Sequence, residues 1–89
     1  MASYEVRWKA SAVKDLKKIE PKRIPRIIES VESLRIDPFP SGSHKLRKTE
    51  RIYRIRIGEY RLLYEVDTQA KKIIIYYIRH RREAYRIRI

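Results

Sequence analysis

The segment from Arg51 to Val66, RIYRIRIGEYRLLYEV, constrains the fold more than any other part of the sequence. Apolar and charged residues alternate with a period of two before and after Gly58, and β-branched and aromatic residues are frequent. This pattern predicts two β-strands joined by a tight turn at Gly58, which together form an antiparallel hairpin. Because one face of the hairpin must be buried, the other face carries Arg54, Arg56 and Arg61 together.

Three guanidinium groups on neighbouring strands lie roughly 5 Å apart, where like charges repel. A protein tolerates such a group at a solvated edge, or where an anion lies between the side chains. The charge of the chain favours the second explanation, because 23 Lys and Arg face 11 Asp and Glu, for a net charge of +12. Residues 44–89 hold fourteen of the basic and five of the acidic side chains.

A basic excess concentrated in one half of a chain indicates a surface that meets a polyanion. Solubility and binding to a membrane surface are the alternatives. Since no basic amphipathic anchor helix is predicted, nucleic acid is the favoured partner.

The length and composition predict one globular domain over residues 1–89, with 43% hydrophobic and 38% charged residues. The chain has no cysteine, which excludes disulfides and thiolate zinc sites. No apolar run approaches the ~18 residues of a transmembrane helix, and the start MASYEVRWK does not resemble a signal peptide. We therefore expect a soluble cytoplasmic protein.

The rest of the chain predicts an α+β fold. Alternation over residues 4–8 indicates a first strand, Ser11 is suited to cap a helix, and an apolar stripe at helical spacing indicates a second helix over residues 21–34. The run KIIIYYI at residues 72–78 predicts a central strand covered on both faces, with a partner on the side away from the helices. The predicted architecture is two N-terminal helices packed on a twisted antiparallel sheet of about four strands.

The predicted site is a cationic set on the open face of the hairpin and at the end of the last strand. Other basic residues near it are expected to bind RNA phosphates: Lys45, Arg47, Lys48, Arg79, His80 and Arg82. The two histidines, His44 and His80, each lie beside cations that oppose a metal ion, so neither a metal nor another cofactor is expected.

Cleavage of RNA would require more than binding. Without a metal, the ribose 2′-OH attacks the phosphorus, which requires a group that accepts its proton and cations that stabilise the five-coordinate phosphate. Tyr, with an unperturbed pKa of ~10, and Arg, with a still higher pKa, are poor bases at neutral pH. This leaves His80 as the side chain suited to accept the proton. The residues alone therefore indicate an RNA-binding protein more strongly than a nuclease.

Four motifs together resemble the bacterial and archaeal toxins of the RelE/ParE superfamily. They are KLRK, YRIRIGEYRLLYEV, HRREAY and an LxxDPxP motif formed by Leu34, Asp37, Pro38 and Pro40. The resemblance extends over nearly the whole chain. It implies a small basic toxin held inactive by a cognate acidic, RelB-like antitoxin in a hetero-oligomer. The RelE branch cleaves messenger RNA in the ribosomal A site by 2′-OH attack without a metal, whereas the ParE branch poisons DNA gyrase.

The same resemblance implies roles for individual residues. Arg54 and Arg56 correspond to a basic pair, Arg61 and Arg81 to phosphate-binding arginines that we expect to face solvent, and Tyr85 to a stacking and proton-transfer tyrosine. Glu50 is a loose candidate for a glutamate that some members place before the hairpin. The catalytic set favours the ribonuclease branch, so the expected function is a ribosome-dependent, metal-independent mRNA endonuclease, with a gyrase inhibitor as the alternative.

Overall fold

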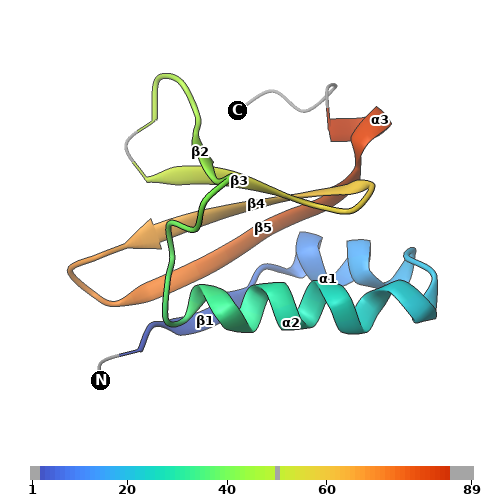
Figure 1. Ribbon diagram of the computed structural model, residues 1–89, viewed down its shortest axis with the longest axis horizontal. Coiled ribbons are helices and arrows are strands. Elements are labelled where there is room, and N and C mark those ends of the chain that lie inside the picture. The colour runs from blue at the N-terminus through green and yellow to red at the C-terminus, as the bar shows by residue number, and fades with distance from the viewer. Residues whose placement is uncertain (1–2, 50, 85–89) are drawn as a thin grey trace.

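The computed structural model describes residues 3–49 and 51–84. A strand is followed by two helices, four further strands and a short final helix (Figure 1). The elements are β1 (Glu5–Trp8), α1 (Ala10–Lys17), a 3₁₀ turn η1 (Pro21–Arg23), α2 (Ile24–Leu34), β2 (His44–Lys45), β3 (Ile52–Ile57), β4 (Tyr60–Asp67), β5 (Lys72–His80) and α3 (Arg81–Ala84).

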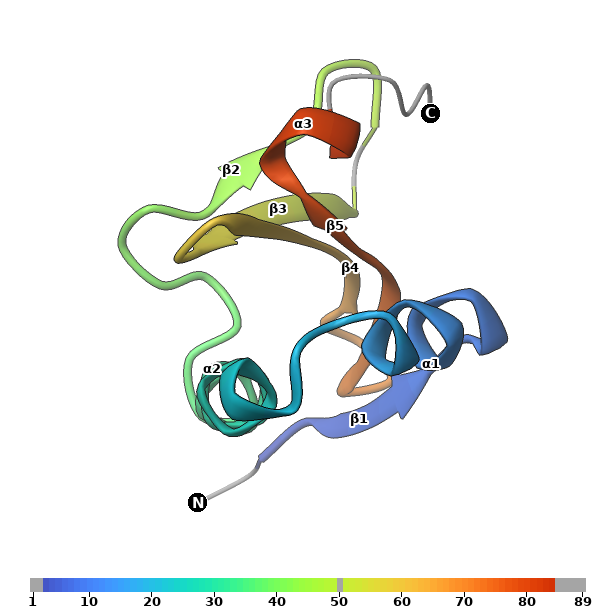
Figure 2. The ribbon, with the colours of Figure 1, turned by 90° about the vertical axis from the view of Figure 1, so that its right-hand side faces the viewer.

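The sheet has five strands in the order β1-β5-β4-β3-β2. The predicted α+β class, with two helices on one sheet, is confirmed, and both helices cover the same face (Figure 2). The sheet is mixed, however, because β1 pairs with β5 in parallel while the other pairs are antiparallel. After β1 the chain passes through both helices and enters the sheet again at its opposite edge. β1 therefore meets the last strand instead of the next one.

The predicted hairpin is formed by β3 and β4, and its turn contains only Gly58 and Glu59, since Ile57 pairs directly with Tyr60. Gly58 has φ +60°, a conformation that glycine adopts at little cost and that two-residue hairpin turns require. The Nε of Arg56 donates a hydrogen bond to the Gly58 carbonyl at 3.0 Å, which ties the end of β3 to the turn.

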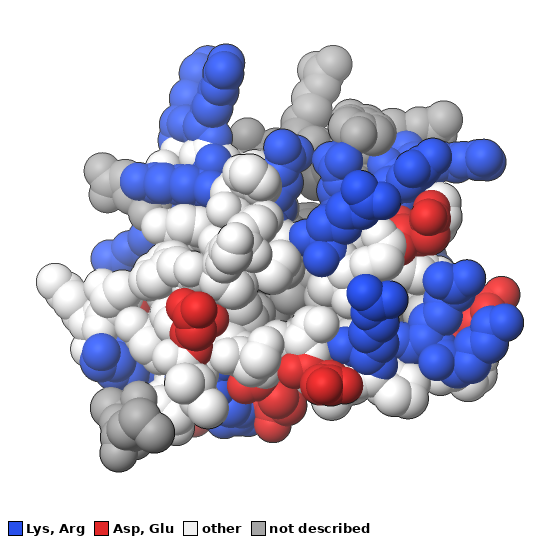
Figure 3. Space-filling model, in the orientation of Figure 1, with Lys and Arg blue, Asp and Glu red and all other residues white. Residues whose placement is uncertain are grey.

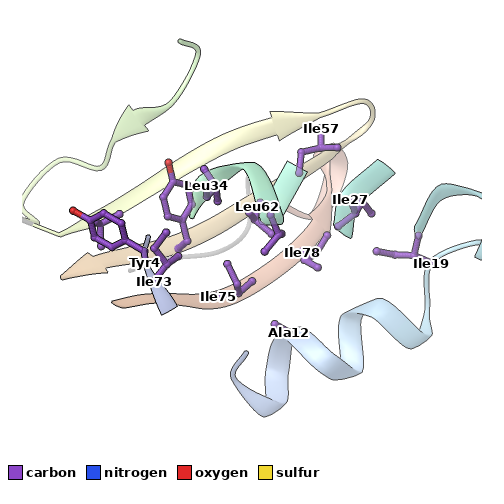
Figure 4. Packing of buried hydrophobic residues seen from close by; sticks show 13 residues of the cluster. Tyr4, Ala12, Ile19, Ile27, Leu34, Ile57, Leu62, Ile73, Ile75 and Ile78 are labelled. Atoms are coloured by element: carbon purple, nitrogen blue, oxygen red, sulfur yellow. The ribbon is translucent and has the colours of Figure 1, made fainter. Parts of the chain in front are cut away.

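The core lies between the helices and the sheet (Figure 4). From α2, the side chains of Ile27, Val31 and Leu34 are buried at helical spacing, as the apolar stripe predicts. From the sheet, buried residues come mainly from the two central strands: Leu62, Tyr64, Val66, Ile73, Ile75 and Ile78. The opposite face of β5 presents Ile74, Tyr76 and Tyr77, all partly exposed.

The first helix does not begin as predicted. Lys9 occupies the N-cap position of α1 without a side-chain hydrogen bond, and Ser11 Oγ instead donates to the carbonyl of Tyr76 at 2.7 Å. Further along α1, the buried Asp15 carboxylate accepts a hydrogen bond from the Ile78 N–H at 3.0 Å. The pairing of β1 with β5 ends at Trp8, so α1 supplies polar partners to the part of the β5 edge that β1 does not reach. The prediction for Ser11 was wrong because this tertiary contact replaces the local one.

Tyr64 fixes the proline-rich loop to the core. Its ring is fully buried, and its hydroxyl donates to the carbonyl of Pro38 at 2.8 Å. Burial raises the pKa of Tyr64 from 10.0 to about 12. The hydrogen bond to the Glu65 carboxylate raises the pKa of Tyr76 to about 12 as well.

We expect Tyr64→Phe to lower the free energy of unfolding by about 1 kcal/mol at pH 8, because the Pro38 carbonyl loses its donor. A tyrosine whose pKa is higher in the folded state stabilises the protein fully below its unfolded value and loses that contribution as the pH rises toward 12. In denaturant titrations, the difference in the free energy of unfolding between the parent and Tyr64→Phe should therefore become smaller between pH 10 and 12. Tyr77→Phe serves as the control, since that hydroxyl makes no hydrogen bond with the described residues. A pH-independent difference would contradict this assignment.

Candidate functional site

A row of arginines crosses the face of the sheet that points away from α1 and α2. Arg56 on β3 pairs with Arg61 on β4, and Arg61 pairs with Arg79 on β5. Arg54 lies two residues before Arg56 and therefore on the same face. Strand alternation, which buries the apolar residues of the hairpin on the helix side, thus gathers these cations on the opposite side.

A cavity of about 310 Å³ opens on the helix side, near η1 and the β3–β4 turn, and a smaller one of about 160 Å³ opens on the arginine face. We call the smaller one the arginine cavity. Its lining residues come from the loop before β2 and from β2, β3 and β4: Gly42, His44, Arg54, Ile55, Arg56 and Arg61. Guanidinium forks around a hollow can hold phosphate oxygens with paired hydrogen bonds, which gives this cavity the chemistry of an anion site.

His44 was not predicted to belong to the site. It lies on β2, directly opposite Arg54, and residues opposite each other in an antiparallel pair share a face of the sheet. A two-residue strand is too short to show a period-two pattern, so the segment around His44 gave no strand signal in the sequence. One signal in the sequence could have placed His44 in the site. His44 and Arg54 are ten residues apart, a separation that allows a short strand to fold back and pair with the hairpin.

The two arginines expected to hold phosphate differ in exposure. The side chain of Arg81 is 54% exposed at the start of α3, as expected. Arg61 is only half-exposed, because β4 is a central strand and Arg61 is flanked by Arg56 and Arg79 on its two neighbours. The expectation that both face solvent is therefore met for Arg81 and only in part for Arg61.

Arg79 is held at the end of the row by an ion pair. Its Nε lies 3.1 Å from the Asp15 carboxylate of α1, and its guanidinium carbon lies 5.0 Å from the centre of the Tyr77 ring. Asp15 thus binds both the backbone of β5 and an arginine of the row, so α1 helps to set the geometry of the arginine face.

The β3–β4 turn contacts the start of α3 and positions Arg81. The backbone N–H of Arg81 donates to the Glu59 carbonyl at 2.8 Å, and its Nε lies 3.6 Å from the Glu59 carboxylate. Glu59 follows the predicted turn residue Gly58, and no role was predicted for it. The register that pairs Tyr60 with His80 makes this contact, and it could have been anticipated from the lengths of the strands and their turn.

His80 lies on the helix side of the sheet, away from the arginine cavity. Its ring contacts the Tyr60 ring edge-on at a centroid distance of 5.6 Å. Its Nδ1 accepts from the Arg82 N–H at 3.3 Å, and its Nε2 lies 3.9 Å from the Glu59 carboxylate. Both ring nitrogens therefore have neighbours, which makes His80 a poorer proton acceptor for a ligand in the arginine cavity than the sequence suggested.

The remaining predicted residues are distributed around the site. Lys45 pairs with Tyr53 and so lies on the face opposite Arg54, while Arg47 and Lys48 are exposed in the β2–β3 loop. Arg82 is exposed on α3. Tyr85 and Glu50 lie outside the described residues.

Positive charge is concentrated on two sides of the molecule. Lys and Arg gather over the upper part and the right-hand end of the view in Figure 3, where Figure 1 places the β2–β3 loop, the β3–β4 turn, α3 and the connection between α1 and α2. Over residues 3–49 and 51–84, no three His, Asp or Glu side chains come together as ligands for a metal ion. No helix in that part of the chain is long and apolar enough to span a membrane.

The fold and the arginine cavity define a small basic α+β protein, and comparison with known proteins identifies its family. Residues 6–85 match the family described as the ParE toxin of the type II toxin-antitoxin system parDE. The chain is 34% identical over 77 residues to the toxin homologue RelE1 of Methanocaldococcus jannaschii, covering 83% of this chain and 86% of that protein. It is 31% identical over 84 residues to the toxin RelG of Mycobacterium tuberculosis, covering 93% of this chain and 97% of that protein.

A solved structure gives the same result. The archaeal RelE–RelB complex from Pyrococcus horikoshii OT3 contains a chain that matches with a TM-score of 0.80 and 30% identity, covering 89% of this chain and 96% of that one. The chain therefore belongs to the RelE/ParE superfamily of toxins from type II toxin–antitoxin systems. Its relatives place it in the RelE branch.

Proposed function

We propose that this toxin is a ribosome-dependent endonuclease that cleaves messenger RNA in the ribosomal A site. The observation that carries the proposal is the arginine cavity, where Arg54, Arg56 and Arg61 surround one hollow on an open face of the sheet. In the proposed reaction, the ribose 2′-OH attacks the adjacent phosphorus and the bond from phosphorus to the 5′-oxygen breaks. No metal is required, since arginines supply the positive charge that the five-coordinate phosphate needs.

The arginines divide by position. Arg61, half-buried and flanked by cations, is suited to hold the scissile phosphate with a fixed fork. Arg81 approaches from α3 beside the turn and stabilises the developing charge. Arg54 and Arg56, both exposed at the rim, orient the neighbouring phosphates. Tyr85 remains a predicted stacking and proton-transfer residue outside the described part of the chain.

An acidic, RelB-like antitoxin is the proposed partner. The solved relative from Pyrococcus horikoshii is a RelE–RelB complex, and others from Mycobacterium tuberculosis and Methanococcus jannaschii are toxin–antitoxin complexes as well. In this chain, the net charge of +12 and the partly exposed Ile74, Tyr76 and Tyr77 suit an acidic segment with apolar anchors that folds on binding. Purification of the protein from its native operon without a small acidic partner would contradict this proposal.

A gyrase poison is the second candidate function. The observation that favours it is the family match, whose description names the ParE toxin. The two candidates differ in the process that stops first after induction of the toxin. An mRNA endonuclease stops translation while DNA supercoiling is still normal, whereas a gyrase poison alters supercoiling first.

We expect translation to fail first, because the arginine cavity has the chemistry for phosphoryl transfer on RNA. The measurement combines amino-acid incorporation, plasmid supercoiling and primer extension on transcripts taken at short times after induction. Cleavage sites should fall within translated regions and disappear when initiation is blocked. Cleavage of free RNA should be slow, since arginine is a poor base and the ribosome supplies part of the geometry. An early loss of supercoiling with intact transcripts would establish the gyrase function instead.

A further inference from the structure

The proposed reaction lacks a proton acceptor among the arginines, and the structure offers one inside the cavity. His44 lines the arginine cavity together with Arg54, Arg56 and Arg61. Directly opposite residues in an antiparallel pair have Cβ atoms about 5 Å apart, so the His44 ring and the Arg54 guanidinium project side by side. A phosphate held by these arginines would therefore place its ribose within reach of the imidazole.

The surroundings of His44 differ from those of His80. The His44 side chain is exposed and makes no hydrogen bond or ion pair with the residues that the structure describes. By contrast, both nitrogens of His80 have polar neighbours on the other face of the sheet. Of the two histidines in the chain, only His44 thus presents its ring to the arginine cavity.

The charged groups that line the arginine cavity with His44 are cations. They are Arg54 and Arg56 from β3 and Arg61 from β4, and within residues 3–49 and 51–84 no carboxylate lines the cavity. In a neutral imidazole, one ring nitrogen carries a lone pair that can accept a proton.

We propose that His44 is the general base that accepts the proton of the attacking 2′-OH, an inference that rests on the proposed endonuclease function. As the proton moves to the imidazole, the 2′-oxygen forms its bond to phosphorus. The bond from phosphorus to the 5′-oxygen breaks, and its electron pair remains on that oxygen, which takes a proton from water. The products are a 2′,3′-cyclic phosphate and a 5′-hydroxyl end, and the imidazolium returns its proton to solvent.

The test measures single-turnover cleavage of a short message on purified ribosomes between pH 5 and 8. In the parent protein, the rate should rise with pH and then level off, as catalysis by a general base requires. His44→Ala should lower the rate about 10²-fold at pH 7 and flatten this rise, and added imidazole should restore part of the rate. His44→Gln, which keeps the size and polarity of the side chain, should show the same flat profile. His80→Gln should keep the pH-dependent rise, whatever its absolute rate.

Controls separate this inference from the proposed function. Lys17→Ala, an exposed change on α1 far from the cavity, should keep the parent rate. Melting temperatures of the His44 variants should match that of the parent, because His44 is exposed on a two-residue edge strand. If the parent cleaves while His44→Ala keeps the parent rate and pH profile, the base is another group and the endonuclease function stands. The role of His44 would also be overturned if His44→Ala cleaved slowly but kept the pH-dependent rise and its rate did not increase with added imidazole. A parent protein that leaves ribosome-bound message intact would overturn both proposals.

Discussion

Arg61→Ala should lower the rate of message cleavage on the ribosome by about 10²–10³-fold, which is the usual effect of removing one preorganised donor to a transition-state charge. Arg61 is suited to this role because its neighbours on both adjacent strands restrict its side chain. A guanidinium held in place before the substrate arrives needs little reorganisation when charge develops on the phosphate. The comparison should be made under single-turnover conditions, where product release does not limit the rate.

A further variant distinguishes charge from geometry at this position. Arg61→Lys keeps the positive charge and most of the packing but replaces the planar fork with a point charge, so its rate should lie between those of the parent and Arg61→Ala. Arg81→Ala, at an exposed position on α3, should reduce cleavage by a similar factor of ~10²–10³ without a change in melting temperature.

Stability must be measured alongside activity, since Arg61 is half-buried. Its removal loses packing but also relieves repulsion from Arg56 and Arg79, so the free energy of unfolding should change by no more than about 1 kcal/mol. Lys17→Ala removes the same charge from an exposed site on α1 and should change neither property. Cleavage by Arg61→Ala and Arg81→Ala at the parent rate would show that the arginine face is only a docking surface.

The sequence was sufficient to predict the parts of the site that depend on strand alternation. The period-two pattern from Arg51 to Val66 specifies which residues of the hairpin are buried, and a two-residue turn at Gly58 sets the register. Together these place Arg54, Arg56 and Arg61 on one face before any tertiary contact is considered. The apolar stripe of α2 was equally clear, because it shows the period expected of a helix with one buried face.

The parts that were missed depend on contacts between residues far apart in the chain. The parallel pairing of β1 with β5 requires a crossover through both helices, for which strand patterns carry no information. His44 lines the cavity only because β2 pairs with β3. His80 lies on the other face of the sheet because the register of β5 places it opposite Tyr60. Ser11 has the local chemistry of a helix cap, yet its hydroxyl binds the backbone of Tyr76 across 65 positions of the chain.

The same long-range chemistry makes Asp15 the polar residue whose loss should destabilise the fold most. Its carboxylate is buried, with 5% of the residue exposed, and accepts hydrogen bonds from the Ile78 N–H and from Arg79 Nε. Asp15→Ala leaves the Ile78 N–H without its acceptor and Arg79 without its ion pair. Losing a charged acceptor at a buried site costs about 3 kcal/mol, and the better helix propensity of alanine offsets ~0.5 kcal/mol of that.

We therefore expect Asp15→Ala to lower the melting temperature by roughly 10–20 °C, since each kcal/mol corresponds to about 4–8 °C in a domain of this size. Asp15→Asn should lose about half as much, because the amide oxygen can still accept from Ile78 N–H while the charge that pairs with Arg79 is gone. Glu29→Ala removes an exposed carboxylate from α2 and should stay within ~0.5 kcal/mol of the parent. Calorimetry or thermal denaturation followed by circular dichroism would measure the melting temperatures of the three variants and test this prediction. If both Asp15 variants had the melting temperature of Glu29→Ala, water would have to supply the hydrogen bond to the Ile78 N–H at the edge of β5. In that case α1 would stabilise the fold through apolar packing alone.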